Sequence, residues 1–156
     1  MPRFHPPLLG GLFIGILSLL PFVSAANLCC CLWVVLGGVL TVYLQQQASP
    51  VPVESGEAAM SGLMAGAVGG VIYILGMTFL LSSADVGAAI ESGLRGAIEQ
   101  NPQIPAETLA RLEGLLTGRN LLVLIGVVTL PMYAIFSMLG SLLGLTIFRK
   151  KAPANV

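Results

Sequence analysis

Residues 58–81 read AAMSGLMAGAVGGVIYILGMTFLL, and this stretch decides the fold class. It contains no charged side chain, and at about 1.5 Å per residue a helix over it spans about 36 Å. That length crosses a hydrocarbon core of roughly 30 Å with some tilt. Gly62, Gly66 and Gly70 recur every four residues and therefore share one face of the helix. Because this face lacks side chains, a second helix backbone can approach it closely, as happens between helices in lipid.

The composition indicates a membrane environment for the chain as a whole. The 156 residues are 56% hydrophobic and 9% charged, and their mean hydropathy is +0.93. Soluble domains carry about 25% charged residues, and a soluble fold this poor in charge would expose large apolar patches. The seven basic and seven acidic residues cancel. No overall positive field attracts nucleic acid, so we expect no nucleic-acid partner.

Three further apolar stretches, at residues 8–24, 28–44 and 121–148, predict membrane-spanning helices. Together with 58–81 they predict an all-α membrane protein with four transmembrane helices in a single integral membrane domain, residues 1–156. Residues 8–24 have a second interpretation, because a basic start, an apolar run and Val23-Ser24-Ala25 are typical of a cleavable signal peptide. Glycines in the run and a second apolar stretch directly after it favour a retained helix.

Two polar segments lie between these helices. Residues 45–57 contain two prolines and predict a loop. Residues 84–118 carry apolar side chains every four positions, which predicts an amphipathic helix that is broken at Asn101-Pro102. A second short helix follows, with Gly118 as its C-cap. We therefore expect an amphipathic helical hairpin between the third and fourth membrane helices, on the membrane surface or over the mouth of the bundle.

Basic residues predict the orientation of the chain. Arg3 near the start and the cluster Arg149, Lys150 and Lys151 near the end favour the cytoplasmic side. Four spans place both termini on the same side, so these two signals agree. We predict a multi-pass protein of the cell membrane, the inner membrane in a prokaryote, with both termini cytoplasmic.

The last predicted helix carries a second face of small residues: Ser137, Gly140, Ser141 and Gly144. We expect this face to pack against the Gly62–Gly70 run. Small-residue faces serve packing within one chain or association between chains, and both interpretations remain open. The expected partners are the lipid bilayer and, for the second interpretation, another copy or another membrane protein.

Three polar side chains are candidates for more than packing. Tyr73 and Tyr133 lie near the midpoints of their predicted spans, and Thr129 lies on the same helix as Tyr133. A hydroxyl in the middle of a bilayer needs a hydrogen-bond partner. The group is either structural, holding helices together, or part of a binding site for a substrate.

The sequence offers little for metal or catalytic chemistry. Cys29, Cys30 and Cys31 are adjacent, so on a helix they point about 100° apart and cannot share one ion within a monomer. They serve as small buried residues or in a redox pair near the outer surface. The predicted spans contain no Asp, Glu, Lys, Arg or His. We therefore predict no metal, no cofactor and no enzymatic activity.

Several stretches resemble a family of small prokaryotic multi-pass membrane proteins of the domain-of-unknown-function type. The resemblance lies in Asn27-Leu28-Cys29-Cys30-Cys31-Leu32-Trp33 followed by Gly37-Gly38, in the glycine-rich third span and in the amphipathic stretch 100–113. Such relatives often carry basic residues after the second span, where this chain has Gln45-Gln46-Gln47. The resemblance implies a multi-pass fold and carries over no functional residue.

These observations support two hypotheses about function. The first is a membrane component without catalytic chemistry, structural or involved in assembly, that packs through small-residue helix faces. The alternative is a passive pore or a transporter of small solutes lined by Tyr, Ser and Thr.

Overall fold

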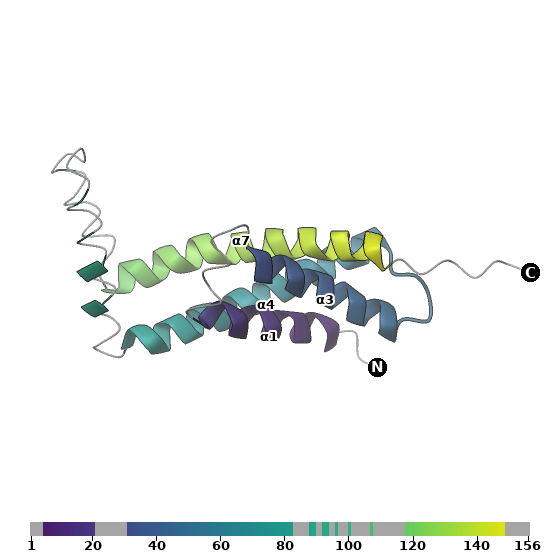
Figure 1. Ribbon diagram of the computed structural model, residues 1–156, viewed down its shortest axis with the longest axis horizontal. Coiled ribbons are helices and arrows are strands. Elements are labelled where there is room, and N and C mark those ends of the chain that lie inside the picture. Colours follow the sequence, from purple (N-terminus) through teal and green to yellow (C-terminus); the bar gives the residue numbers. More distant parts are fainter. Residues whose placement is uncertain are drawn as a thin grey trace, which may run out of the picture. The chain divides into compact units, whose positions relative to one another are not determined.

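The chain is described by a computed structural model at residues 5–20, 31–82, 88–89, 92–93, 96, 100, 107 and 118–148. Its four long helices are α1 (His5–Leu19), α3 (Leu32–Ala48), α4 (Ser55–Ser82) and α7 (Gly118–Ile147) (Figure 1). All regular structure in the described part is helical, which confirms the all-α class. The chain divides into two compact units, Met1–Tyr73 with Thr129–Val156, and Ile74–Val128. The first unit contains α1, α3, the first part of α4 and the last part of α7.

Proline and backbone conformation set the ends of α1 and α3. α1 begins at His5 because Pro6 and Pro7 fit a first turn, and it ends at Leu19, shortly before Pro21. α3 begins at Leu32 because Cys31 has the left-handed φ of 50°. The helices thus begin at residues 5 and 32, where we predicted spans from residues 8 and 28, and residues 21–30 lie outside the described part of the chain.

α3 also extends further than predicted, so the predicted loop over residues 45–57 starts too early. Gln45, Gln46 and Gln47 belong to the last turns of α3, which ends at Ala48. Glutamine is a good helix former, and the chain leaves the helix only at Ser49 (φ −94°, ψ 132°), the residue before Pro50.

α4 and α7 begin before their predicted starts. α4 starts at Ser55 and has Glu57 in its first turn, where a carboxylate interacts favourably with the helix dipole. α7 starts at Gly118, which we predicted as the C-cap of a preceding helix, and continues through Pro131. The hairpin predicted over 84–118 lies mostly outside the described residues; the positions described within it are helical at 88–89, 92–93, 96 and 107.

Two of the described helices are long and apolar enough to cross a membrane, α4 and the Leu122–Ile147 part of α7. α1 has 15 residues and α3 has 17, so they reach about 22 and 25 Å, against roughly 30 Å for a hydrocarbon core. The prediction of four spans therefore meets the length requirement in two helices and falls short of it in α1 and α3.

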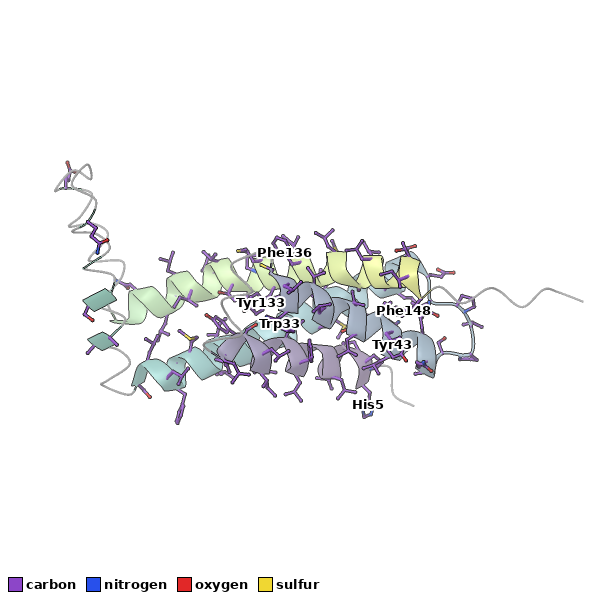
Figure 2. The ribbon with its side chains drawn as sticks, in the orientation of Figure 1. His5, Trp33, Tyr43, Tyr133, Phe136 and Phe148 are labelled. Atoms are coloured by element: carbon purple, nitrogen blue, oxygen red, sulfur yellow. The ribbon has the colours of Figure 1, made fainter. Side chains whose placement is uncertain are left out.

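The helices of the first unit form a ring in the order α1, α3, α7, α4, in which each packs against the next (Figure 1). α1 is antiparallel to α3, and α4 is antiparallel to α7. The starts of α1 and α4 and the ends of α3 and α7 consequently lie together. His5, Ala48 and Gly56 line one groove there, and the Tyr43 and Phe148 rings meet with centroids 5.1 Å apart (Figure 2). We call this the His5 end of the bundle.

The Gly62–Gly70 run packs directly against the backbone of α7. A Cβ atom on Gly62 would collide with the Ser141 side chain. One on Gly66 would collide with the Tyr133 carbonyl oxygen and would lie 2.7 Å from the Ala134 Cα. Glycine is therefore required at both positions for the observed spacing of α4 and α7.

The other three contacts of the ring also use glycine. Between α1 and α4, a Cβ on Gly11 would lie 2.8 Å from the Ala65 carbonyl oxygen, and one on Gly69 would lie 2.7 Å from Ile14. Between α1 and α3, Gly10 lies against the Thr41 side chain. α4 thus contacts α1 through Gly69, which directly precedes Gly70 in the sequence but lies on a different side of the helix.

The small-residue face of α7 is divided between two partners. Gly140 lies against the Val35 carbonyl and Gly144 against Val42, so both contact α3. Of the predicted face, only Ser137 and Ser141 turn toward the Gly62 face of α4. The reason is the helical spacing, because the mean direction of residues 137 and 141 differs by about 60° from that of residues 140 and 144.

Small and polar residues lie between the helices together with a few large apolar ones, Ile14, Val34 and Val42, whereas many large apolar side chains are exposed. The buried hydroxyl residues are Ser18, Thr41, Ser61, Ser137 and Ser141. Exposed large side chains occur on every helix of the first unit: Leu8, Leu12, Ile16, Leu32, Leu36, Leu63, Val71, Ile135, Leu139 and Leu143. A helical bundle in water has the opposite distribution, with leucine-type side chains facing the core.

In the second unit, the described helical ends approach each other more loosely. A Cβ on Gly126 would lie 3.7 Å from the Ile74 Cδ1, an ordinary van der Waals distance. The tight backbone contacts are thus a property of the first unit.

We predict that Gly66→Ala destabilises the bundle by about 1–3 kcal/mol, because the new methyl group overlaps backbone atoms of α7, which cannot move aside independently. Gly56→Ala in the first turn of the same helix is the matched control, since nothing lies within 4 Å of its Cβ position. Helix content followed during denaturation by sodium dodecyl sulfate, starting from mild micelles, measures the difference. Equal stability of the two variants would contradict the described packing.

Candidate functional site

The structure brings two of the three polar candidates together. The Tyr73 and Tyr133 rings lie side by side across the α4–α7 contact, with centroids 5.7 Å apart and planes at 40°. Tyr133 is buried and shares a side-chain hydrogen bond with Ser18 of α1. Thr129 is half-buried on α7, one turn before Tyr133. Tyr133 thus links α7 to α1.

The serines of α7 contribute one direct link between helices. The Ser141 hydroxyl lies 2.7 Å from the Ala58 carbonyl oxygen of α4 and 2.8 Å from the Met138 carbonyl oxygen of its own helix, so its single proton is shared between two acceptors. Ser137 Oγ is buried, and no atom in the described part of the chain is within hydrogen-bonding distance. The Ser137 carbonyl oxygen lies against both Gly38 and Gly62.

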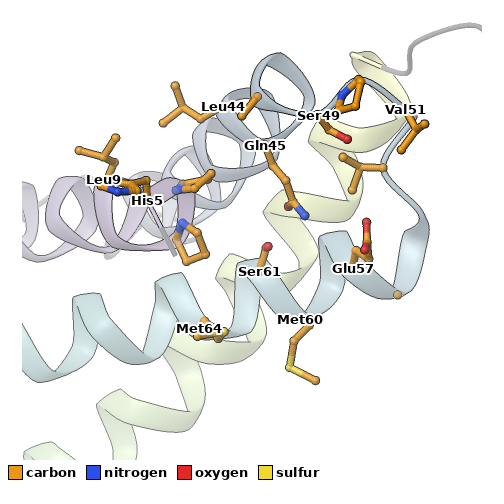
Figure 3. A pocket seen from close by; sticks show the side chains of 16 residues that line it. His5, Leu9, Leu44, Gln45, Ser49, Val51, Glu57, Met60, Ser61 and Met64 are labelled. Atoms are coloured by element: carbon orange, nitrogen blue, oxygen red, sulfur yellow. The ribbon is translucent and has the colours of Figure 1, made fainter. Parts of the chain in front are cut away.

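A groove lies at the His5 end of the first unit. It has a volume of about 870 Å³ and lies between the start of α1, the end of α3 and the start of α4 (Figure 3). Much of its wall is apolar, including Pro6, Pro7, Leu9, Leu44, Met60 and Met64. A site of this size with a few polar groups is typical of pockets for small molecules.

Polar groups reach the groove from each of the three helices. His5 comes from α1, Gln45 from α3, and Glu57 and Ser61 from α4. Figure 3 shows the Gln45 side chain pointing from α3 toward α4, where Ser61 and Glu57 lie. Gln45 Oε1 is buried and accepts no hydrogen bond from any described residue. Because this oxygen atom has almost no accessible surface, a ligand in the groove cannot reach it while the Gln45 side chain keeps this conformation.

Gln46 is the most deeply buried amide at this end of the bundle. Its side chain is 2% exposed, and neither Nε2 nor Oε1 has a hydrogen-bond partner in the described residues. A buried amide without partners costs about 1–3 kcal/mol. The neighbouring Gln47, in contrast, is exposed and donates from Nε2 to the Tyr43 hydroxyl, 3.1 Å away.

The sequence analysis missed the groove because it assigned Gln45 to a loop. One signal was present: Val42 and Gln46, and likewise Tyr43 and Gln47, are four residues apart, which continues the helical pattern of α3. The remaining wall comes from the starts of α1 and α4. The predicted alternation of four spans places these starts on the same side as the end of α3, but it does not indicate a groove there.

The described part of the chain does not bring together a set of side chains of an ordinary catalytic type. It contains no cluster of three or more His, Cys, Asp or Glu side chains that could hold a metal ion. Cys31 is buried at the start of α3, while Cys29 and Cys30 lie outside the described residues. Comparison with protein-family models, curated proteins and solved structures finds no match to this chain. The family resemblance noted above therefore stays a prediction.

We predict that Gln46→Met raises stability by about 1–3 kcal/mol, because methionine has a similar shape and removes the cost of an unpaired buried amide. Gln47→Met is the matched control and should change stability by less than about 0.5 kcal/mol, since Gln47 is exposed. Thermal unfolding in the same micelles measures both. A loss of stability in Gln46→Met would mean that the amide has a partner in the folded protein.

Proposed function

We propose that this chain is an integral membrane protein without catalytic chemistry, a structural component whose four helices all cross the bilayer and pack through small residues. The observation that carries the proposal is the distribution of side chains, with glycine, serine and threonine at the close helix contacts and exposed leucine side chains on every helix. In water, this arrangement would leave an apolar surface exposed on every helix. In lipid it is favourable, because tails solvate the leucines and small residues allow close helix contacts.

The outward-facing leucines extend the proposal to α1 and α3. Leu8 and Leu12 on α1 and Leu32 and Leu36 on α3 are all at least 40% exposed. Helices shorter than the hydrocarbon core are accommodated when the bilayer thins locally, at a modest cost in free energy. Both helices also pack through glycine against α4 or α7, the two helices long enough to cross.

Hydroxyl groups on the outer surface agree with a lipid environment. Thr78 and Thr146 are exposed, yet each donates a hydrogen bond to a carbonyl of its own helix, at 2.8 Å to Ile74 and 2.7 Å to Leu143. A hydroxyl that is satisfied within its own helix does not need water.

The orientation follows from charge and from the common end of the helices. His5 and Phe148 lie at the same end of the first unit, so the segments with Arg3 and with Arg149–Lys151 continue from that end. We assign the His5 end to the cytoplasm by the positive-inside rule, with residues 21–30 and 83–117 on the outer side.

The glycine contacts favour packing within the chain over association through the same faces. A neighbouring helix of the same chain packs directly against each of the glycines Gly62, Gly66, Gly140 and Gly144. Any assembly with another copy or another membrane protein would therefore use the apolar outer faces. Ile14, Val34 and Val42 are fully buried between the helices, and no observation favours a pore through the interior.

The side of the membrane on which the connection between α1 and α3 lies distinguishes an arrangement of four spans from one of two spans. We predict that a membrane-impermeant maleimide labels the native Cys29 and Cys30 in intact cells, since four spans place this connection outside. Gln47→Cys at the His5 end, in a background with Cys29→Ala, Cys30→Ala and Cys31→Ala, should react only after the membrane is permeabilised. Protection of Cys29 and Cys30 until permeabilisation, with helix content unchanged, would reject the four-span arrangement.

A further inference from the structure

The ends of α3 and α7 meet at the His5 end in a pair of exposed aromatic side chains. The Tyr43 and Phe148 rings make an edge contact with centroids 5.1 Å apart (Figure 2). Tyr43 is 38% exposed and Phe148 is 40% exposed. The Phe148 amide donates to the Gly144 carbonyl oxygen at 2.9 Å, so Phe148 continues the last turn of α7. We call this pair the aromatic rim; it is fixed by two helices and accessible from outside.

Positive charge adjoins the aromatic rim. Residues 149–151, Arg-Lys-Lys, directly follow Phe148, and Arg3 lies two residues before His5. These basic residues lie outside the described part of the chain, but the backbone connects them to described residues. Consecutive Cα atoms are about 3.8 Å apart, so three steps keep the Cα of residue 151 within about 12 Å of the Phe148 Cα. Covalent connection therefore confines these cations to the His5 end.

The charges of the whole sequence divide unequally between the two ends of the bundle. The His5 end has four basic residues and two acidic ones, Glu54 and Glu57 at the start of α4, which gives a net charge of +2. The other five acidic residues and three arginines lie within residues 85–119, which connect the opposite ends of α4 and α7. That connection carries −2. Two cations at the His5 end thus have no acidic counterpart in the sequence.

We propose that the seam between α3 and α7 at the His5 end binds an anionic phospholipid. Its phosphate lies at the aromatic rim among the basic residues, and one acyl chain follows the outer faces of the two helices. The inference rests on the proposed membrane arrangement. Two uncompensated cations favour a head group with a net negative charge. A zwitterionic lipid carries its own cation and gains less from the same charges.

The Tyr43 hydroxyl supplies a hydrogen-bond donor at this place. Its oxygen accepts a hydrogen bond from Gln47 Nε2, 3.1 Å away, and both side chains are exposed. A phenol keeps one proton of its own to donate, and a phosphate oxygen is a strong acceptor for it. The exposed Thr146 on α7 differs, because its hydroxyl already donates to the Leu143 carbonyl oxygen at 2.7 Å.

The helix faces beside the seam fit an acyl chain. Leu36 and Tyr43 are seven residues apart and share one face of α3, and Leu143 and Ile147 share one face of α7. All four side chains are exposed. Leu36 and Tyr43 each follow a residue that contacts α7, and Leu143 precedes Gly144, which contacts α3. The two apolar faces therefore border the same seam and lead away from the aromatic rim.

Quenching by brominated lipids tests the proposal, because it measures which lipid lies beside a chosen tryptophan. The full chain is reconstituted with brominated phosphatidylglycerol or brominated phosphatidylcholine. Phe148→Trp in a Trp33→Phe background reports on the aromatic rim, and the native chain reports through Trp33 at the start of α3. Beside the rim, we expect phosphatidylglycerol to bind at least about fivefold more strongly, which corresponds to about 1 kcal/mol. At Trp33 we expect no preference for it.

A charge-matched pair of variants assigns the preference to the basic residues. Both are made in the chain that reports on the rim. The first removes the charges after α7: Arg149→Gln, Lys150→Gln and Lys151→Gln. It should lower the ratio to one or below. The second removes three charges from the opposite connection: Arg95→Gln, Arg111→Gln and Arg119→Gln. It should leave the preference in place, because these residues lie beyond the range of screened charges.

A second pair of variants tests the hydroxyl donor. Tyr43→Phe keeps the ring of the aromatic rim and should lower the ratio about threefold, since it removes one hydrogen bond to the phosphate. Thr146→Val removes a hydroxyl whose proton is used within α7 and should leave the ratio unchanged. Unchanged helix content verifies that each variant folds.

Three outcomes overturn the inference. Equal quenching by the two lipids beside the rim would do so and leave the proposed four-span arrangement intact. A preference that survives loss of the charges at residues 149–151 would mean that another feature causes it. Loss of the preference on addition of soluble glycerol phosphate would assign the site to free phosphate. Quenching by neither lipid at either tryptophan would instead contradict the proposed membrane arrangement itself.

Discussion

Close approach of helix backbones at positions without side chains is the constraint on which this structure depends. Each of the four contacts in the ring has at least one glycine whose Cβ would overlap the neighbouring helix, such as Gly10, Gly66, Gly69 and Gly140. Dispersion contacts and weak hydrogen bonds between backbones replace the burial of leucine that holds soluble bundles together. Many large apolar side chains are consequently left on the outside of every helix, and the surroundings must be apolar for the arrangement to be stable.

The same constraint explains why polar groups occupy the interior without forming a channel. Helices this close leave room for hydroxyls that bond to a backbone carbonyl nearby, as Thr41 does to Gly37 at 2.8 Å and Ser141 to Ala58 at 2.7 Å. The tight contacts do not extend to the His5 end, where longer side chains line a groove. Gln45 and Glu57 line that groove, which lies where the close packing stops.

The helices and the glycine face of α4 could be predicted because they depend on local periodicity. A recurrence of four residues places Gly62, Gly66 and Gly70 on one face whatever their partner is. Which helix packs against each glycine could not be predicted. Gly69 and Gly140 are as small as the other glycines, and the choice of neighbouring helix depends on the packing of all four helices at once. Gln46 shows the limit most clearly: a polar residue was assigned to a loop, yet it is almost fully buried on a helix. The left-handed backbone conformation of Cys31, directly before α3, could not be predicted either, because the residues next to it do not indicate it.

The central claim is that lipid surrounds all four helices. Nitroxide labels on one exposed residue of each helix test it directly, at Leu12→Cys, Leu36→Cys, Leu63→Cys and Leu139→Cys, in a chain without native cysteines reconstituted into bilayers. Collision with oxygen, which concentrates in the hydrocarbon, is compared with collision with a water-soluble nickel complex. The account predicts that oxygen dominates at all four positions. Preferential access of the nickel complex at Leu12 and Leu36 would contradict it, because α1 and α3 would then face water.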